Sequence, residues 1–163
     1  MRIVFQAIGV IRSPFQQIDG MPVQPAGAAG VQGTVEVYPE FAAGLQDLEG
    51  FSHIFLIYHL HRSEGFNLTV TPFLDKEPHG VFATRAPRRP NPIGLSVVHL
   101  LRRDGNVLHI ENVDVLDGTP LLDIKPYVGE FDRFTADRFG WLEKASGQIK
   151  EKRSDDRFGI SSG

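Results

Sequence analysis

Hydrophobic and polar residues alternate with a period of two in several short segments, which is the pattern of half-buried β-strands. In Gly33–Tyr38, Val35 and Val37 fall on one face and polar residues lie between them. Ser52–His61 is instead an almost continuous apolar run, which predicts a strand buried on both faces. The same reasoning predicts further strands at Arg2–Ile11, Asn67–Phe73, Gly80–Thr84, Leu95–Arg103 and Val107–Val113.

The connections between these segments are turns and loops rather than long helices. Arg103–Asn106, with the sequence RDGN, predicts a hairpin because Asp-Gly tolerates the positive φ of a tight turn. One short helix is expected in Tyr38–Leu48, with Pro39 near its start and Glu40 near the positive end of its dipole. Met21–Gly33 has no periodicity and predicts a long loop. Short strands with so little helix predict a mainly β fold, either an antiparallel barrel or a sandwich.

The C-terminal part of the chain has a different character. From Asp132 onward it is strongly charged, and Trp141 is its one large anchor. We expect a docked segment up to about Leu142, followed by a solvated helix or tail. The sequence therefore predicts one domain, residues 1–142, and a charged, partly helical C-terminal tail, residues 143–163.

Composition and charge exclude several classes of protein. The 163 residues contain no cysteine, which excludes disulfides and thiolate metal sites. No apolar run approaches the roughly 18 residues of a membrane helix, and the first residues do not form a signal peptide, so we expect a cytoplasmic protein without a membrane partner. The net charge of -3 gives no global nucleic-acid footprint. Positive charge for an RNA partner has to be local or assembled by oligomerisation.

The segment Thr84–Ser96, TRAPRRPNPIGLS, combines three arginines with three prolines. Each proline fixes its own φ and holds the preceding residue extended, which predicts a stiff loop. One interpretation is a proline-rich connection with solvated arginines. The other is a grip on an anion or carboxylate by Arg85, Arg88 or Arg89, with Gly94 allowing the backbone to approach a ligand closely.

A second polar stretch follows further along the chain. Asp117–Pro120 has the residue types of a tight turn, and again two interpretations stay open. It is either only a turn, or its exposed N–H groups and the Asp117 carboxylate bind a polar ligand. In the strand after it, Asp123 and Lys125 share one face, and Leu122 and Ile124 take the other.

Histidines near the end of the long apolar run raise the question of a metal. His59 and His61 are two residues apart, so they are expected on one strand face, where they could be metal ligands. A third ligand is not evident, so ordinary polar residues at a strand end are expected and no metal site is predicted.

The stretches FATRAPRRPNPIGLS and DVLDGTPLLDIKPY together resemble the signature of the TsaA-like family, which includes the YaeB/TrmO tRNA methyltransferases. The likeness also covers IGVIRSPF, MPVQPAG and LEGFSHIFLIYHLHR, and so spans about Phe5 to Tyr127. It implies a single-sheeted antiparallel β-barrel. It also implies methyl transfer from S-adenosyl-L-methionine to N6 of N6-threonylcarbamoyladenosine next to the tRNA anticodon, by a homodimer.

The family's cofactor positions carry over by motif. They fall on Pro22, Val23, Gln24, His61, Arg62, Arg85 or Arg89, Leu95, Asp117, Gly118, Thr119 and Pro120. Longer bacterial members carry an additional C-terminal domain, whereas 36 residues follow Tyr127 here, so we expect a short form.

The implied reaction sets demands on the site. The acceptor N6 is conjugated to a carbamoyl group, so it needs in-line placement and must lose its proton. Asp117, Asp123 and Tyr127 are the nearest candidates in sequence for the proton acceptor, and the sequence does not rank them. The loop arginines suit the threonyl carboxylate of the modified base by bidentate pairing.

Other functions remain open from the sequence. The chain could be a non-catalytic module that binds an adenosyl ligand or RNA, as a sensor or adaptor, or a plain structural barrel. For the methyltransferase we expect tRNA as substrate and a homodimer with the cofactor site at or beside its interface. The arginines expected to gather at a cleft there are Arg62, Arg85, Arg88 and Arg89.

Overall fold

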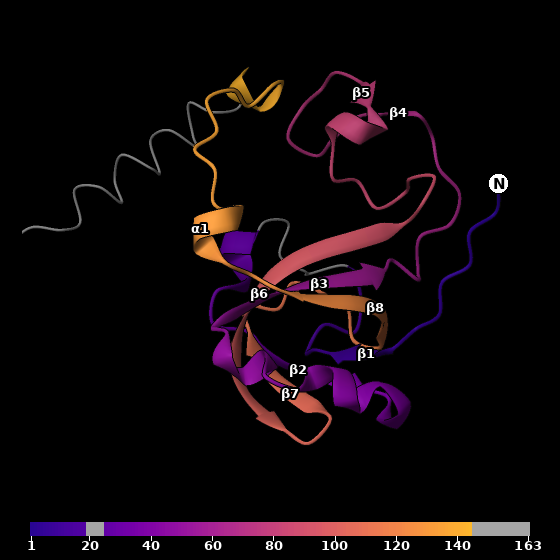
Figure 1. Ribbon diagram of the computed structural model, residues 1–163. Coiled ribbons are helices and arrows are strands. Elements are labelled where there is room, and N and C mark those ends of the chain that lie inside the picture. The colour runs from indigo at the N-terminus through magenta and orange to yellow at the C-terminus, as the bar shows by residue number, and fades with distance from the viewer. Residues whose placement is uncertain (19–24, 145–163) are drawn as a thin grey trace, which may run out of the picture. The chain divides into compact units, whose positions relative to one another are not determined.

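The computed structural model describes residues 1–18 and 25–144. Within them, six antiparallel strands close into a barrel in the order β1-β2-β7-β6-β3-β8 (Figure 1). The barrel strands are β1 (Gly9–Arg12), β2 (Gln32–Val37), β3 (His53–His59), β6 (Ile93–Asp104), β7 (Val107–Glu111) and β8 (Thr119–Pro126). The predicted antiparallel barrel is confirmed, and the sandwich is not formed.

The remaining elements are short. Two further strands, β4 (Thr69–Val70) and β5 (His79–Gly80), pair with each other outside the barrel. The helical elements are η1 (Pro25–Ala28), η2 (Pro39–Leu45), η3 (Leu48–Gly50), η4 (Val81–Ala83) and α1 (Gly129–Asp132). No helix among the described residues is long and apolar enough to cross a membrane.

The chain folds into two compact units. The barrel unit comprises Met1–Gly65 and Pro90–Arg133, and it contains the barrel. The loop unit comprises Phe66–Arg89 and Phe134–Gly163, of which the structure describes residues up to 144. The predicted boundary at residue 142 stays a prediction, because most of the tail lies outside the described residues.

The core fills the barrel with the inward residues of alternating strands. On β2, Val35 and Val37 are buried as the alternation predicts. On β3, Ile54, Leu56 and Tyr58 are buried but the residues between them are only half-buried. The prediction that this strand is buried on both faces is therefore wrong, because its outward-facing residues keep part of their surface exposed.

The connections follow the turn chemistry of the sequence in two places. The predicted hairpin joins β6 to β7, and Gly105 adopts a φ of 61° within its two-residue connection. The predicted short helix is present as η2 and η3, two 3-10 helices, with Pro39 in the first turn. Asp47 separates them with a φ of 69°.

Several expected strands are shorter than their apolar runs or absent. In Arg2–Ile11, the strand begins at Gly9, preceded by backbone hydrogen bonds of Ile8 with Leu121 and Tyr38, so most of the segment forms no strand. Asn67–Phe73 contains only the two residues of β4. Gly80–Thr84 is not a strand, because β5 ends at Gly80 and the chain turns into η4. Backbone pairing, which needs a neighbour of matching length, overrode local β propensity here.

Candidate functional site

One end of the barrel collects residues from four strands. At this end β3 finishes, and its Tyr58 lies opposite Gly94 on β6 and Leu121 on β8. The start of β8 in turn pairs with the end of β1, where Ile11 lies opposite Thr119. Seven of the predicted cofactor residues lie at this end: His61 and Arg62 after β3, Leu95 on β6, and Asp117, Gly118, Thr119 and Pro120 around the start of β8.

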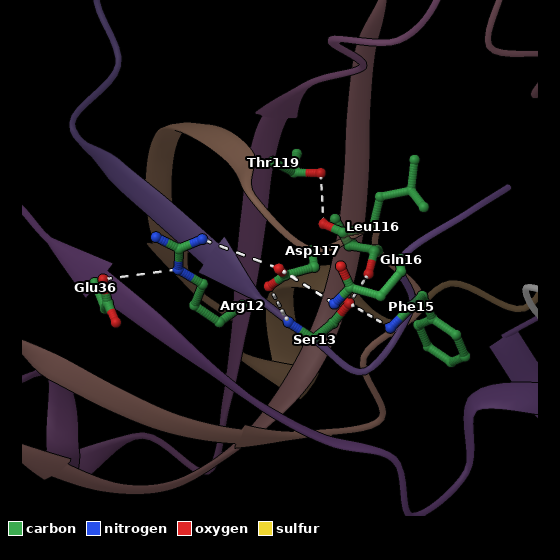
Figure 2. Close-up of polar contacts among 9 residues, drawn as sticks. Arg12, Ser13, Phe15, Gln16, Glu36, Leu116, Asp117 and Thr119 are labelled. Atoms are coloured by element: carbon green, nitrogen blue, oxygen red, sulfur yellow. Dashed lines mark hydrogen bonds and ion pairs between the residues drawn. The ribbon is translucent and has the colours of Figure 1, made fainter.

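The turn before β8 is formed by Leu116–Thr119 (Figure 2). The backbone N–H of Thr119 donates to Leu116 O over 3.3 Å, and its hydroxyl donates to the same oxygen over 2.7 Å. Gly118 has a φ of 77°, which a left-handed turn position requires and which glycine adopts without strain. A tight turn is therefore present, one residue earlier than the sequence indicated.

The N–H groups of this turn are not available to a ligand. The amide of Asp117 donates to Phe15 O over 2.8 Å, and that of Gly118 donates to Ile11 O over 2.9 Å. The prediction that exposed turn N–H groups bind a ligand is therefore wrong. They hold the turn to the segment that leaves β1.

The Asp117 carboxylate binds the same segment (Figure 2). It accepts from Ser13 N over 3.1 Å and from Gln16 Nε2 over 3.4 Å, and it lies 4.0 Å from an Arg12 guanidinium nitrogen. Arg12 also lies 3.9 Å from Glu36. Asp117 thus fixes the start of the connection that leads to Pro22–Gln24, which lie outside the described residues.

A buried polar chain, which the sequence reasoning missed, runs inside this end of the barrel. The hydroxyls of Tyr58 and Ser96 lie 2.8 Å apart, and Ser96 donates to Asp114 Oδ1 over 2.7 Å, so Tyr58 donates to Ser96. Burial raises the pKa of Tyr58, the bond to Ser96 opposes this, and the charge of Asp114 adds to it. The signal in the sequence is the small pair Gly94 and Ser96 within an apolar strand.

Gly94 has a packing role at this site. A Cβ placed there would lie 2.1 Å from Cε2 of Tyr58, so the tyrosine ring occupies the space that a side chain would need. The interpretation that Gly94 admits a ligand is wrong for this face of the residue. The missing side chain lets the Tyr58 ring lie against the backbone of β6.

His61 and Arg62 belong to a turn that follows β3. The strand ends at His59, Leu60 N donates to Pro92 O over 2.8 Å, and Ser63 N donates to Leu60 O over 3.0 Å. His59 and His61 therefore do not share a strand face, contrary to the prediction. Desolvation, then the charges of Arg62 and His59, lower the pKa of His61, and a backbone hydrogen bond at His59 opposes them.

No group of three or more His, Asp or Glu side chains within residues 1–18 and 25–144 is arranged to hold a metal ion. Arg62 is exposed and makes no ion pair with any other described residue. His61, favoured as the neutral imidazole, can exchange hydrogen bonds with hydroxyl groups, and Arg62 can pair with a carboxylate.

The arginine loop, Thr84–Ser96, belongs partly to the loop unit, up to Arg89, and partly to the barrel unit, from Pro90. In the loop unit, one guanidinium nitrogen of Arg89 donates to Thr84 O over 3.0 Å and to Ala86 O over 3.1 Å. The Thr84 hydroxyl donates to Val81 O and accepts from Ala86 N, over 2.9 and 3.2 Å. Arg89 is therefore a clamp that stiffens the loop. Arg85 and Arg88 are exposed, and no described residue is paired with them.

Trp141 fastens the loop unit internally, in keeping with the expectation that it is an anchor. Its indole N–H donates to Ala83 O over 2.8 Å, and its ring stacks on His79 with centroids 5.0 Å apart. His79 Nε2 lies 2.6 Å from Asp75 Oδ2. The hydrogen bond from His79 lowers the pKa of Asp75, with backbone hydrogen bonds acting in the same direction.

The three sequence candidates for the proton acceptor lie in different places. Asp117 is at the barrel end described above, whereas Asp123 is beside Lys125, with 3.0 Å between Oδ2 and Nζ. Asp123 also lines a cavity of about 440 Å³ with Phe41, Leu48 and other apolar residues. Tyr127 follows the far end of β8, against the Phe55 ring.

A β-bulge separates the two parts of β8. Ile57 lies opposite Asp123 and Tyr58 opposite Leu121, so Leu122 is an extra residue. Leu121 rather than Leu122 is therefore buried, which corrects the expected alternation. The strand is roughly 23 Å long at about 3.3 Å per residue. Asp117 and Tyr127, which flank it, cannot serve the same reacting atom.

Comparison with known proteins assigns the chain to a family. The family model described as tRNA-methyltransferase O N-terminal domain matches residues 10–133. The chain belongs to this family. The TsaA-like resemblance read from the arginine loop and the DGTP turn is thereby confirmed, and both stretches lie within the match.

Individual relatives of the tRNA-methyltransferase O family support this. A "Probable S-adenosyl-L-methionine-binding protein" of Pyrococcus abyssi is 56% identical over 97% of this chain and 86% of its own length. The "tRNA (adenine(37)-N6)-methyltransferase" of Escherichia coli is 37% identical over 76% of this chain and 57% of its own. The crystal structure of TrmO from Pseudomonas aeruginosa matches with a TM-score of 0.73 and 39% identity, over 88% of this chain and 62% of that one.

Proposed function

We propose that this protein transfers the methyl group of S-adenosyl-L-methionine to N6 of N6-threonylcarbamoyladenosine next to the anticodon of tRNA. The observation that carries the proposal is the gathering of His61, Arg62, Leu95 and the Asp117 turn at one end of the barrel. Membership of the tRNA-methyltransferase O family supports it, since a relative is named for methylation of adenine 37 of tRNA.

The residues at the barrel end fit an adenosyl cofactor chemically. Leu95 is 64% exposed, which offers an uncovered apolar surface to a purine ring. His61 offers hydrogen bonds to ribose hydroxyls, and Arg62 offers a cation to the amino-acid carboxylate. The cofactor, when bound, supplies a methyl group that its sulfonium has already activated.

The protein's own residues position the cofactor and the acceptor base, and one of them accepts the proton of N6. The Asp117 contacts and the chain from Tyr58 through Ser96 to Asp114 fix the backbone on both sides of the site. Of the three sequence candidates, we propose Asp117 for the proton of N6, because it lies at this end of the barrel; Asp114 is an alternative there. Both carboxylates already accept hydrogen bonds, and each keeps a lone pair that can accept the proton.

A two-part experiment tests this function. Titration calorimetry with S-adenosyl-L-methionine or S-adenosylhomocysteine should show a binding site on the wild-type protein, and Arg62→Ala should weaken it. Mass spectrometry of tRNA nucleosides, after incubation of unmethylated tRNA with the protein and cofactor, should show the methylated threonylcarbamoyladenosine. Folded protein that neither binds the cofactor nor methylates tRNA contradicts the proposal.

A second function is a non-catalytic module that binds an adenosyl ligand. The name of the Pyrococcus abyssi relative favours it, because that name states binding alone. The chain spans about three fifths of the Escherichia coli and Pseudomonas aeruginosa relatives, at 57% and 62%. Turnover separates the two functions. A binding module shows calorimetric heat with the cofactor but passes no labelled methyl group to tRNA.

We also propose that the protein is a homodimer with its cofactor site beside the interface. The outer face of β6 exposes Ile93 and Val97 at 41% each, on either side of Leu95. The opposing residues of β3, Phe55 and Ile57, continue this apolar face. Contiguous exposed apolar surface of this kind is typical of an interface. Leu95 belongs both to this face and to the proposed cofactor set.

Sedimentation at micromolar concentration tests the assembly. Wild-type protein should be a dimer, and Val97→Lys should produce monomers because it places a charge in the apolar face. Phe131→Lys, a substitution at a 72% exposed residue of α1, is the matched control and should leave the dimer intact. A wild-type monomer that methylates tRNA at full rate contradicts the proposal. The proposed substrate also implies the cytoplasm as compartment, and no requirement for metal is proposed, so activity should survive a chelator.

A further inference from the structure

An exposed phenylalanine stands at the start of the arginine loop. In η4, Val81 is 1% exposed whereas Phe82 is 74% exposed. Single exposed aromatic rings are common on protein surfaces, so exposure alone does not imply a ligand. Phe82 is set apart by its fixed backbone and by the positive charge that follows it.

The backbone on both sides of Phe82 is fixed within the loop unit. Val81 N donates to Leu68 O over 2.9 Å, and Val81 O accepts from Thr84 N and the Thr84 hydroxyl. Ala83 O accepts the indole N–H of Trp141 over 2.8 Å. The ring therefore projects from a braced turn, the short coil directly after β5 in Figure 1. Because this backbone is already fixed, it loses little conformational freedom when the ring binds a partner.

The segment that begins at η4 and contains Phe82 carries positive charge only. The segment Val81–Arg89, VFATRAPRR, has three arginines and no acidic residue, although the whole chain has a net charge of -3. Arg89 is used internally, but Arg85 and Arg88 are exposed. Local positive charge beside an exposed ring complements a single-stranded nucleic acid, which presents base faces and phosphates together.

We propose that Phe82 is a stacking platform for an unpaired base of the tRNA anticodon loop, with Arg85 and Arg88 binding phosphates next to that base. The inference rests on the proposed tRNA substrate and adds how the chain holds it. Only an unpaired base can expose its face to the ring, because base faces in a duplex are stacked on their neighbours. The platform therefore selects loop over stem.

Binding of a labelled anticodon stem–loop RNA, measured by fluorescence anisotropy, tests this. Phe82→Leu keeps apolar volume but removes the π face, and it should weaken binding roughly tenfold. Phe82→Tyr keeps the ring and should bind like wild type. Phe131→Leu, at a similarly exposed phenylalanine of the barrel unit, should also bind like wild type. Calorimetric affinity for S-adenosylhomocysteine should be the same in all four proteins.

Three further readouts make the outcome decisive. A fully paired RNA of equal length should bind wild type and Phe82→Leu equally, since it offers no base face. Arg85→Ala and Arg88→Ala should each reduce the slope of log affinity against log salt by about 1. Circular dichroism of Phe82→Leu should match wild type, as expected for an exposed position.

The possible failures are distinguishable. If Phe82→Leu binds the stem–loop as tightly as wild type while wild type methylates tRNA, the stacking platform is overturned and the proposed function stands. If Phe82→Tyr loses as much affinity as Phe82→Leu, aromatic stacking is likewise overturned. If the wild-type protein binds no RNA at all, the platform and the proposed function are both overturned.

Discussion

The turn at Asp117 and the loop at Arg85 are both rigid, but they keep different groups available. In the barrel unit, the amides of Asp117 and Gly118 donate to their own chain, and the Asp117 carboxylate accepts from Ser13. In the loop unit, backbone contacts and Arg89 fix the loop, while Arg85 and Arg88 stay exposed. The barrel end thus shapes a site with its backbone, and the loop offers charged side chains from a fixed frame.

The strongest test of this contrast is Gly94→Ala in the barrel unit. A Cβ at this position meets the Tyr58 ring at 2.1 Å, so the substitution should destabilise the fold by at least about 2 kcal/mol and reduce cofactor binding. Urea unfolding measures the loss. Gly44→Ala is the control, since no atom lies within 4 Å of its added Cβ, and it should change stability by less than about 0.5 kcal/mol. Equal effects at the two glycines would contradict the packing role.

Ser96→Ala should have the next largest effect. It leaves the buried Tyr58 hydroxyl without its partner and removes a donor from Asp114, at a cost of about 1–2 kcal/mol in unfolding free energy. Adding Tyr58→Phe to Ser96→Ala should recover part of the loss, because it removes the orphaned hydroxyl. If the double variant loses more unfolding free energy than the two single variants together, the hydrogen-bonded side chains of Tyr58, Ser96 and Asp114 do not act as a unit.

In the loop unit, Trp141→Phe should affect RNA binding rather than the stability of the barrel. It keeps a ring for His79 to stack on but removes the N–H that binds Ala83 O, a change of about 1 kcal/mol. Affinity for stem–loop RNA should fall several-fold, and the thermal midpoint of the barrel should stay unchanged. A lowered thermal midpoint with unchanged RNA affinity would mean that Trp141 supports the fold rather than the loop.

The smallest expected effect is the titration of His61. Its folded pKa is below the ordinary value, so folding favours the neutral ring. The associated stability is complete above the ordinary histidine pKa and is lost as pH falls through the folded value. Because the side chain is largely solvated, the change should stay below about 0.5 kcal/mol. NMR of the imidazole protons should give a midpoint below 6.5, and His61→Gln should remove this part of the pH dependence.

Patterns within single segments predicted much of the barrel. The alternation of Val35 and Val37, and the RDGN hairpin, depend on neighbours in sequence, and both are found as expected. The segment Arg2–Ile8 has equally good β propensity but forms no strand, because strand length is set by partners elsewhere in the chain. Local propensity cannot report where those partners end.

The site shows the same limit. The residue types at Asp117–Thr119 predicted a turn, but its amide partners Phe15 and Ile11 lie about a hundred residues earlier, so its closed hydrogen bonding was not foreseeable. Tyr58 and Ser96 were missed because their contact depends on the register between β3 and β6. Family resemblance supplied the cofactor positions instead, and those among the described residues of the barrel unit lie at one end of the barrel.

The bulge at Leu122 changes which residues of β8 face inward, from odd-numbered to even-numbered positions. Before it, odd-numbered residues such as Leu121 point inward, and after it the even-numbered Ile124 packs against the core. The alternation of inward and outward residues is regular within each half of β8. A change in the half next to the turn therefore does not alter which residues face inward in the half that contains Asp123. Deleting Leu122 would place Asp123 directly after Leu121 and remove the bulge, with Leu121 and Ile124 still facing inward and Asp123 and Lys125 still facing outward. The bulge therefore marks a position where the length of β8 can change by one residue without exchanging the two faces of the strand.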